Sequence, residues 1–223
     1  EVNVKAMQGK QLASVDRVEV YPMVEPQTRL LAVKDSQLDV MLAQDQNATE
    51  TLGADNKLKP ELLARGIRLQ RFIDPEYTYT YYNWQDPVWG GSELHKIALR
   101  RAVSMAYNID DEIKVIRKNQ AIAAEYLVPP GVVGYKPDYV SSIRYNPPLA
   151  NALLDKFGYK KGADGYRNTP DGKPFSFRYS STPSSTEREF DELYKKNLDA
   201  IGIRFEAHKE QFAELKKLEK RCL

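Results

Sequence analysis

The sequence is poor in the residues on which metal and thiol chemistry depend. It has one cysteine, Cys222, and two histidines, His95 and His208, among 223 residues. Cys222 has no second thiol with which to form an internal disulfide. Neither histidine lies in a His-Glu-x-x-His pattern, and two histidines with one cysteine do not complete a zinc site. We therefore expect neither a metal site nor a cofactor.

The sequence also lacks a long apolar run and a surplus of charge of one sign. No apolar run approaches the roughly 20 residues that a membrane-spanning helix requires. The 33 Lys and Arg nearly balance the 31 Asp and Glu, which gives no reason to expect nucleic acid or an anionic membrane as a partner. No signal peptide is recognisable. Because the chain opens at Glu1 rather than at a methionine, its start leaves the localisation open.

Motifs of the common enzyme classes are incomplete. Gly90-Gly91-Ser92 begins like a nucleophile elbow, but Leu94 stands where that motif requires glycine. Gly172-Lys173 lacks the earlier glycine and the following hydroxyl residue of a phosphate loop. A run of carboxylates at Glu187, Glu189, Asp191 and Glu192 fits a solvated helix face better than an acid–base pair. We therefore expect no enzyme; a hydrolase whose catalytic residues lie outside this chain is the alternative.

Two short patterns invite a modification or a calcium site. Asn47-Ala48-Thr49 matches a glycosylation acceptor, a pattern that arises readily by chance. Asp164-Gly165 and Asp171-Gly172 are typical of surface turns, and their spacing departs from that of an EF-hand. Neither pattern predicts a functional site.

The first third of the chain alternates between strand and helix patterns. Apolar and charged residues alternate in the predicted strands, and Pro26 and Pro60 introduce the predicted helices. The predicted order is strand, helix, strand, helix, strand, over residues 15–24, 28–33, 38–42, 60–65 and 67–73. This order is typical of an α/β unit.

Residues 77–84 are unusually aromatic. Alternation places Tyr77, Tyr79 and Tyr81 on one face of an extended segment. Tyrosine and tryptophan offer an apolar body with a polar tip, which suits a cleft for a peptide or a sugar, although β-propensity alone explains each tyrosine singly. Asp86-Pro87 and Gly90-Gly91 then interrupt the chain. We predict part of a first α/β lobe over residues 1–80, a hinge or crossover over 81–91, and part of a second, incomplete lobe over 92–223.

The second lobe is predicted to be mostly helical before a strand, helix, strand unit. Helices are expected at 94–106 after an N-cap at Ser92, from Asp110 to about residue 118, and at 149–157. Strands at 175–181 and 203–207 flank a helix at 186–201, for which Thr186 and Glu189 are expected to form a capping box. A strand, helix, strand order favours a parallel pair with a right-handed crossover.

A series of short motifs follows one another in a defined order along the chain. It includes Tyr82-Asn83, the helix end at residues 101–110, Val128-Pro129-Pro130-Gly131, Tyr145-Asn146-Pro147 and Phe157-Gly158-Tyr159, and continues through Asp171-Gly172-Lys173-Pro174 to Gly202-Ile203. In this order the chain resembles the family 5 extracellular solute-binding proteins, which include dipeptide- and oligopeptide-binding components of ABC importers. Family members are much longer than this chain, and the acidic residue that pairs with a peptide's α-amino group lies downstream of the region matching 212–223.

The resemblance implies a periplasmic-binding-protein-like (type II) α/β fold, with mixed sheets flanked by helices in two lobes that close on a solute. It implies a non-catalytic, monomeric protein of the periplasm or another extracytoplasmic space that delivers a solute, most often a peptide, to an ABC transporter permease. Nickel complexes, haem and oligosaccharides are the alternative ligands, and a module that docks to a partner protein without a solute is a further rival. The residues expected to face the ligand are Tyr81, Tyr82, Asn83, Trp84 and Trp89.

Overall fold

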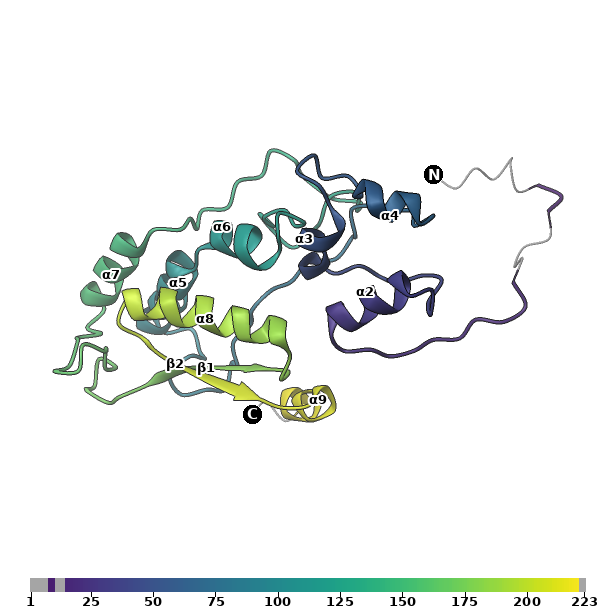
Figure 1. The fold of residues 1–223 in the computed structure, drawn as a ribbon. Helices are drawn as coiled ribbons and strands as arrows, with labels where there is room; N and C mark the ends of the chain where they lie inside the picture. The colour runs from purple at the N-terminus through teal and green to yellow at the C-terminus, as the bar shows by residue number, and fades with distance from the viewer. Residues whose placement is uncertain (1–7, 11–14, 221–223) are drawn as a thin grey trace.

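The computed structural model describes residues 8–10 and 15–220, and its regular elements fall into two groups (Figure 1). The first group is small and helical. It contains α2 (Pro26–Lys34), the short 3-10 turn η1 (Asp45–Asn47), α3 (Ala48–Thr51) and α4 (Pro60–Ala64). The second group contains α5 (Leu94–Ala106), α6 (Ile109–Asp111), the π-helical turn η2 (Glu112–Ile116), α7 (Pro147–Lys156), β1 (Ser176–Ser181), α8 (Ser185–Ala200), β2 (Arg204–Lys209) and α9 (Phe212–Lys220).

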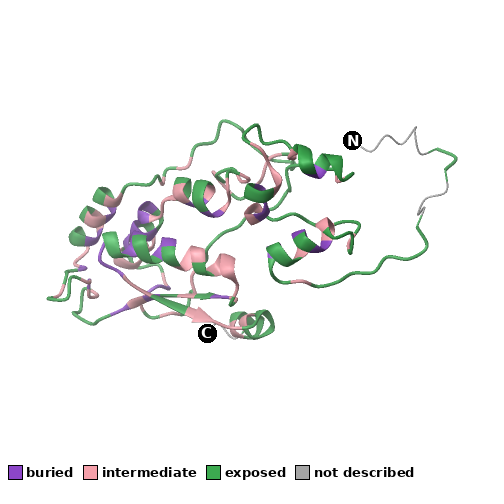
Figure 2. Ribbon diagram, viewed as in Figure 1, coloured by how far each residue is buried: buried purple, intermediate pink, exposed green. Residues whose placement is uncertain are grey.

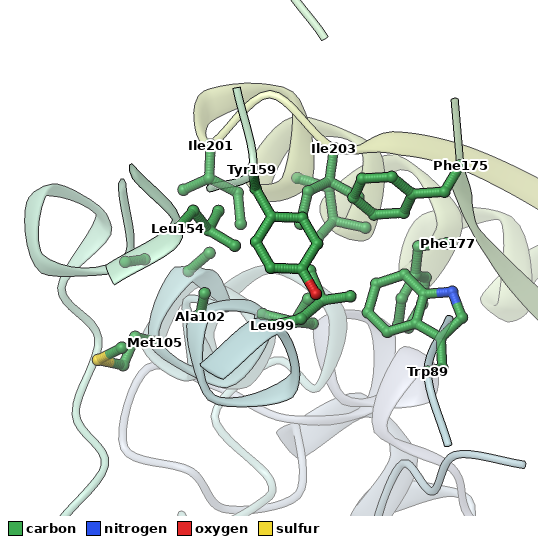
Figure 3. Packing of buried hydrophobic residues seen from close by; sticks show 14 of the residues in the cluster. Trp89, Leu99, Ala102, Met105, Leu154, Tyr159, Phe175, Phe177, Ile201 and Ile203 are labelled. Carbon is green, nitrogen blue, oxygen red and sulfur yellow. The ribbon is translucent and has the colours of Figure 1, made fainter. Parts of the chain in front are cut away.

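The hydrophobic core lies in the second group. Helix α5 buries one stripe of its surface, including Leu99 and Ala102, which are fully inaccessible to solvent, and it packs against α7. Trp89, Tyr159 and Phe175 converge over Leu99, with ring centroids 5.8 Å apart for the pairs that Phe175 makes with each of the other two (Figure 3). Figure 2 shows that most buried residues gather around α5, α8 and the strands. The core therefore holds the second group together.

The two strands form a parallel pair, as the sequence predicts. β1 and β2 run in register from Ser176 opposite Arg204 to Ser181 opposite Lys209, and α8 is the crossover between them. The buried face of β1 carries Phe177 into the core, while Arg178 on the other face is exposed. Both strands therefore end, at Ser181 and Lys209, on one edge beside the start of α8.

The predicted helices are confirmed, but three of their predicted caps are wrong. Glu93, not Ser92, precedes α5, and its side chain makes no capping hydrogen bond. Asn108, not Asp110, caps α6 by accepting from the backbone N–H groups of two following residues. Ser184 caps α8 by accepting from the N–H of Glu187, so Thr186 lies inside the first turn. In each of the last two cases, a residue in extended conformation just before the first turn is the one whose side chain reaches the free N–H groups.

We predict that Ser184→Ala lowers the free energy of unfolding by about 1 kcal/mol, because the N–H of Glu187 loses its acceptor. Thr186→Ala, which changes a side chain inside the first turn of α8, is the matched control and is expected to change it by less than about 0.5 kcal/mol. Urea unfolding measures both variants. Equal losses for the two variants would contradict the assignment of the cap.

The three strands predicted in the first third are not formed in the described part of the chain. Residues 15–24, 38–42 and 67–73 are extended or irregular and pair with no other strand there. Val20 is 84% exposed and Val40 is 81% exposed. Alternation of apolar and polar residues creates a strand with two distinct faces, but a strand also requires the hydrogen bonds of a neighbour. The helices predicted between these segments are present as α2 and α4.

A buried arginine joins the ends of two helices. Arg167 lies between α7 and β1, and its side chain is 2% exposed. Its Nε donates to the carbonyl of Ile201 at 2.8 Å, beyond the end of α8, and its Nη1 donates to the carbonyl of Tyr159. Nη2 donates to the side-chain oxygen of Asn151 at 2.8 Å, and Asp155 on the same helix forms an ion pair with Nη1. All three guanidinium nitrogens are therefore satisfied, which is what a buried charge requires.

Candidate functional site

The aromatic segment that connects the two groups of elements, residues 77–91, is named here the aromatic crossing. Its first three tyrosines share one face, as alternation predicts: the ring centroids of Tyr77 and Tyr79 are 5.3 Å apart, and those of Tyr79 and Tyr81 are 6.0 Å apart. Tyr79 is 62% exposed and Tyr81 is 58% exposed. Partial burial and a hydrogen bond to Glu219 of α9 raise the pKa of Tyr81 to about 12. A row of accessible phenol rings therefore lies along the crossing.

The structure separates the five residues that the sequence proposes as ligand contacts. Trp84 is 62% exposed, whereas Trp89 is 8% exposed and belongs to the core. Tyr82 stacks on Trp89 at 5.6 Å between ring centroids, and burial raises its pKa. The indole N–H of Trp89 donates to the carbonyl of Ser176 at 3.0 Å. Tyr81 and Trp84 are thus exposed, Asn83 is half-buried, and Tyr82 and Trp89 pack against each other.

A tight turn at residues 84–90 explains why two tryptophans five positions apart have opposite environments. The carboxylate of Asp86 accepts from the N–H groups of Val88 and Trp89, both at 2.8 Å, and its carbonyl accepts from the N–H of Gly90 at 2.9 Å. A Cβ atom at Gly90 would lie 2.0 Å from the carbonyl oxygen of Trp84, so only glycine allows the chain to fold back here. The turn directs Trp89 inward and Trp84 outward.

Arg100 of α5 fastens this turn to the helix. Its guanidinium donates to the carbonyl of Trp89 and, at 2.9 Å, to the carbonyl of Gly91. The same group lies over the ring of Trp84, with 5.1 Å between its central carbon and the ring centroid. One face of the Trp84 ring is thus covered by a cation, an attractive arrangement, and the exposed surface of Trp84 belongs to the rest of the ring.

A cluster of polar side chains lies where the first group of elements meets α8. The sequence does not predict this cluster. Glu112 of η2 is 8% exposed; it accepts from the Tyr107 hydroxyl and from Nε of Arg117, both at 2.7 Å. Arg117 also pairs with Asp45 of η1 at 3.4 Å and lies over the ring of Phe190. Glu112 and Arg117 are five residues apart, a spacing that the π-helical turn brings together. These bonds link η1 to the second group of elements.

The carboxylate run at the start of α8 is only partly solvated, which corrects the sequence interpretation. Lys209, at the end of β2, pairs with Asp191 at 2.7 Å and donates to the hydroxyl of Ser181 at 2.5 Å. Burial raises the pKa of Glu187, and the nearby Lys209 acts in the opposite direction. Glu192 is exposed, as predicted. Within the run, Asp191 therefore links α8 to the end of β2.

Neither a metal site nor an accessible glycosylation acceptor occurs among the residues that the structure describes. In residues 8–10 and 15–220, no three His, Cys, Asp or Glu side chains are grouped so as to hold a metal ion. Asn47 is 2% exposed, and its amide donates to the carbonyl of Pro26 at 3.1 Å. No helix in these ranges is long and apolar enough to cross a membrane.

Comparison with known families decides the class of the chain. Residues 4–221 match the model of the bacterial extracellular solute-binding proteins, family 5 (middle part). The chain belongs to this family. The match covers the described structure, including the aromatic crossing, the core helices and the parallel strand pair.

Curated relatives of this family 5 chain include two peptide-binding proteins. It is 34% identical over 98 residues to the dipeptide-binding protein of Escherichia coli, covering 44% of this chain and 17% of the relative. It is 31% identical over 121 residues to the di/tripeptide-binding protein 2 of Pseudomonas aeruginosa, covering 53% of this chain and 21% of the relative. The matched region thus spans about a fifth of the length of these relatives.

Solved structures show the fold of this family 5 chain. The crystal structure of NikA from Brucella suis in complex with Fe(III)-EDTA superposes with a TM-score of 0.60, covering 88% of this chain and 38% of that one at 18% identity. At 18% sequence identity, the similarity shows only that the two proteins share a fold. The fold is that of the periplasmic binding proteins, an α/β fold, as the sequence predicts.

Proposed function

We propose that the intact protein binds a short peptide and delivers it to the membrane permease of an ABC importer. The observation that carries this proposal is the similarity to two relatives that are named for di- and tripeptide binding. In this proposal the protein is not an enzyme, and it acts in the periplasm or another extracytoplasmic space as a monomer. Its division into a first lobe over residues 1–80, a hinge or crossover at 81–91 and a second lobe from residue 92 is part of the same proposal.

The aromatic crossing supplies the contact surface in this proposal. Tyr81 and Trp84 lie on its accessible side, Tyr82 and Trp89 support it from the core, and Asn83, which is half-buried, lies between them in the sequence. The backbone of residues 77–82 makes no backbone hydrogen bond within the described part of the chain. An extended peptide recognises such a segment by main-chain pairing, which is independent of its side chains, while exposed aromatic rings contribute apolar contact.

Trp84→Ala in the intact protein is expected to weaken peptide binding about tenfold, because a tryptophan at the centre of an interface typically contributes more than 1 kcal/mol. The free energy of unfolding should change by less than about 1 kcal/mol, since the side chain is 62% exposed. Isothermal titration calorimetry with di- and tripeptides measures the first quantity and urea unfolding the second.

Val133→Ala is the matched control, because Val133 is fully exposed and lies outside the aromatic crossing. It should leave both quantities unchanged. Unchanged affinity in Trp84→Ala would remove Trp84 from the site. Absence of binding by any di- or tripeptide to the wild-type protein would overturn the proposed ligand class.

A further inference from the structure

We infer that Arg100 is a specificity-determining residue, which makes the surface of Trp84 disfavour positively charged side chains of a bound peptide. This inference rests on the proposed function, because it concerns the peptide that would contact Trp84. It assigns to the surface a preference for neutral or acidic side chains over lysine and arginine.

The first step is the position of the charge. Arg100 lies over the ring of Trp84, 5.1 Å from its centroid, so a side chain that stacks on the ring must use the opposite face. An indole ring attracts cations through the negative potential of its face. A guanidinium that already occupies one face withdraws that potential and adds its own positive field. The free face is consequently a poorer site for a second cation.

The second step is that no carboxylate in the described part of the chain pairs with Arg100: that of Asp86, in the same turn, accepts from the N–H groups of Val88 and Trp89 instead. In the described part of the chain Arg100 forms no ion pair, and its amino groups donate to the carbonyls of Trp89 and Gly91 instead. The nearest acidic residue along the chain on that side, Glu93, pairs with Lys96 at 3.2 Å. The positive charge of Arg100 also acts on the core. Burial raises the pKa of Tyr159 to about 12, and the charge of Arg100 lowers the pKa of the same hydroxyl in part.

The third step is the size of the effect. A ligand atom in van der Waals contact with the free face would lie roughly 9 Å from the guanidinium carbon, since contact adds about 3.5 Å to the distance from the ring. With an effective dielectric constant between about 20 and 80, a charge at that distance is disfavoured about two- to twenty-fold. A difference of about five-fold is therefore expected between a charged side chain and its neutral analogue.

The fold fixes the position of the Arg100 guanidinium, so the preference against positively charged side chains is present before a ligand binds. Two hydrogen bonds to the turn and its place on α5, next to the fully buried Leu99, leave the guanidinium little freedom. A side chain that is fixed before the ligand arrives loses no conformational entropy on binding. The arginine that orders the turn thus also sets the potential at its surface.

The test uses tripeptides of alanine that carry either lysine or Nε-acetyl-lysine at one of the three positions. The pair differs in charge and retains the same four-carbon stem. Calorimetry with the intact wild-type protein is expected to show about five-fold tighter binding of the acetylated peptide for at least one position. The ratio of the two affinities, acetylated over unmodified peptide, should fall to about one in Arg100→Met. Arg100→Lys retains the positive charge and should retain the wild-type ratio.

Arg101→Met is the matched control, because Arg101 is the next residue on α5 and is exposed, while the guanidinium that lies over Trp84 is that of Arg100. It removes the same charge and should keep the wild-type ratio. Each ratio compares two peptides on one protein preparation, so loss of folded protein in a variant does not alter it. Equal affinities for both peptides at all three positions in the wild-type protein would overturn the inference even if no Arg100 variant folds.

The same data separate this inference from the proposed function. If tripeptides bind and the ratio is one throughout, the surface binds peptides without regard to charge, and only the inference is overturned. If no tripeptide binds, the proposed ligand class and the inference are both overturned. A wild-type ratio of about five that persists in Arg101→Met and disappears in Arg100→Met supports both.

Discussion

Arg167→Met is expected to lower the free energy of unfolding by about 3 to 5 kcal/mol, because several buried acceptors lose their donor at once. The guanidinium donates to the carbonyls of Ile201 and Tyr159 and to Asn151, and methionine offers no donor to replace it. Buried acceptors that lose their partner incur the full cost of their desolvation. Urea unfolding of the intact protein measures the loss.

Arg178→Met is the matched control for Arg167→Met. Arg178 lies on the exposed side of β1, so the same chemical change should alter the free energy of unfolding by less than about 0.5 kcal/mol. Arg167→Lys is informative as well, because a single ammonium group cannot reach the three elements that the planar guanidinium joins. A loss below about 1 kcal/mol in Arg167→Met would show that the carbonyls find other donors.

Trp89→Ala is expected to lower the free energy of unfolding by about 3 to 5 kcal/mol, since it removes a large ring from a packed core and leaves a cavity. The ring contacts Tyr82, Phe175 and Phe177, and its N–H bonds the carbonyl of Ser176. Trp84→Ala, at the other tryptophan of the chain, provides the comparison because the residue type is identical and the exposure differs. Thermal unfolding followed by circular dichroism measures both.

The difference between the two tryptophans should also be visible in their fluorescence. Within these 223 residues, Trp89→Phe retains the indole of Trp84, and Trp84→Phe retains that of Trp89. Emission at longer wavelength is expected from the exposed Trp84 than from the buried Trp89. Similar stability losses in the two alanine variants, together with similar emission, would contradict the orientation of the turn.

The sequence predicts the helices and the parallel pair well because these elements depend on local pattern. The apolar stripe of α5 and the strand, helix, strand order around α8 are each contained in a short segment. The three strands expected before residue 74 are absent because strand formation depends on a neighbour as well as on alternation. The capping residues of α6 and α8 lie two positions before the predicted ones, because several Ser, Thr, Asn and Asp residues near each helix start are able to act as the cap.

The candidate site is predicted only in part, for a different reason. Composition identifies the aromatic crossing, but it does not distinguish Trp84 from Trp89, because their environments depend on one turn and on Asp86. In the cluster around Glu112, the bonds of Glu112 to Tyr107 and Arg117 depend on a π-helical turn. The remaining contact, between Arg117 and Asp45 of η1, joins residues 72 positions apart in the sequence. Contacts of this kind arise from tertiary packing and leave no local pattern.

The extended segment at residues 15–24 has a consequence for solubility. Its valines alternate with charged residues, and Val18 and Val20 are 75% and 84% exposed. Unpaired strands with apolar faces are templates for association between chains. Arg17 and Glu19, which pair at 2.5 Å, interrupt the apolar run at every second position. Such charges act as gatekeepers against aggregation, so Arg17 and Glu19 are expected to oppose association between chains through the exposed valines.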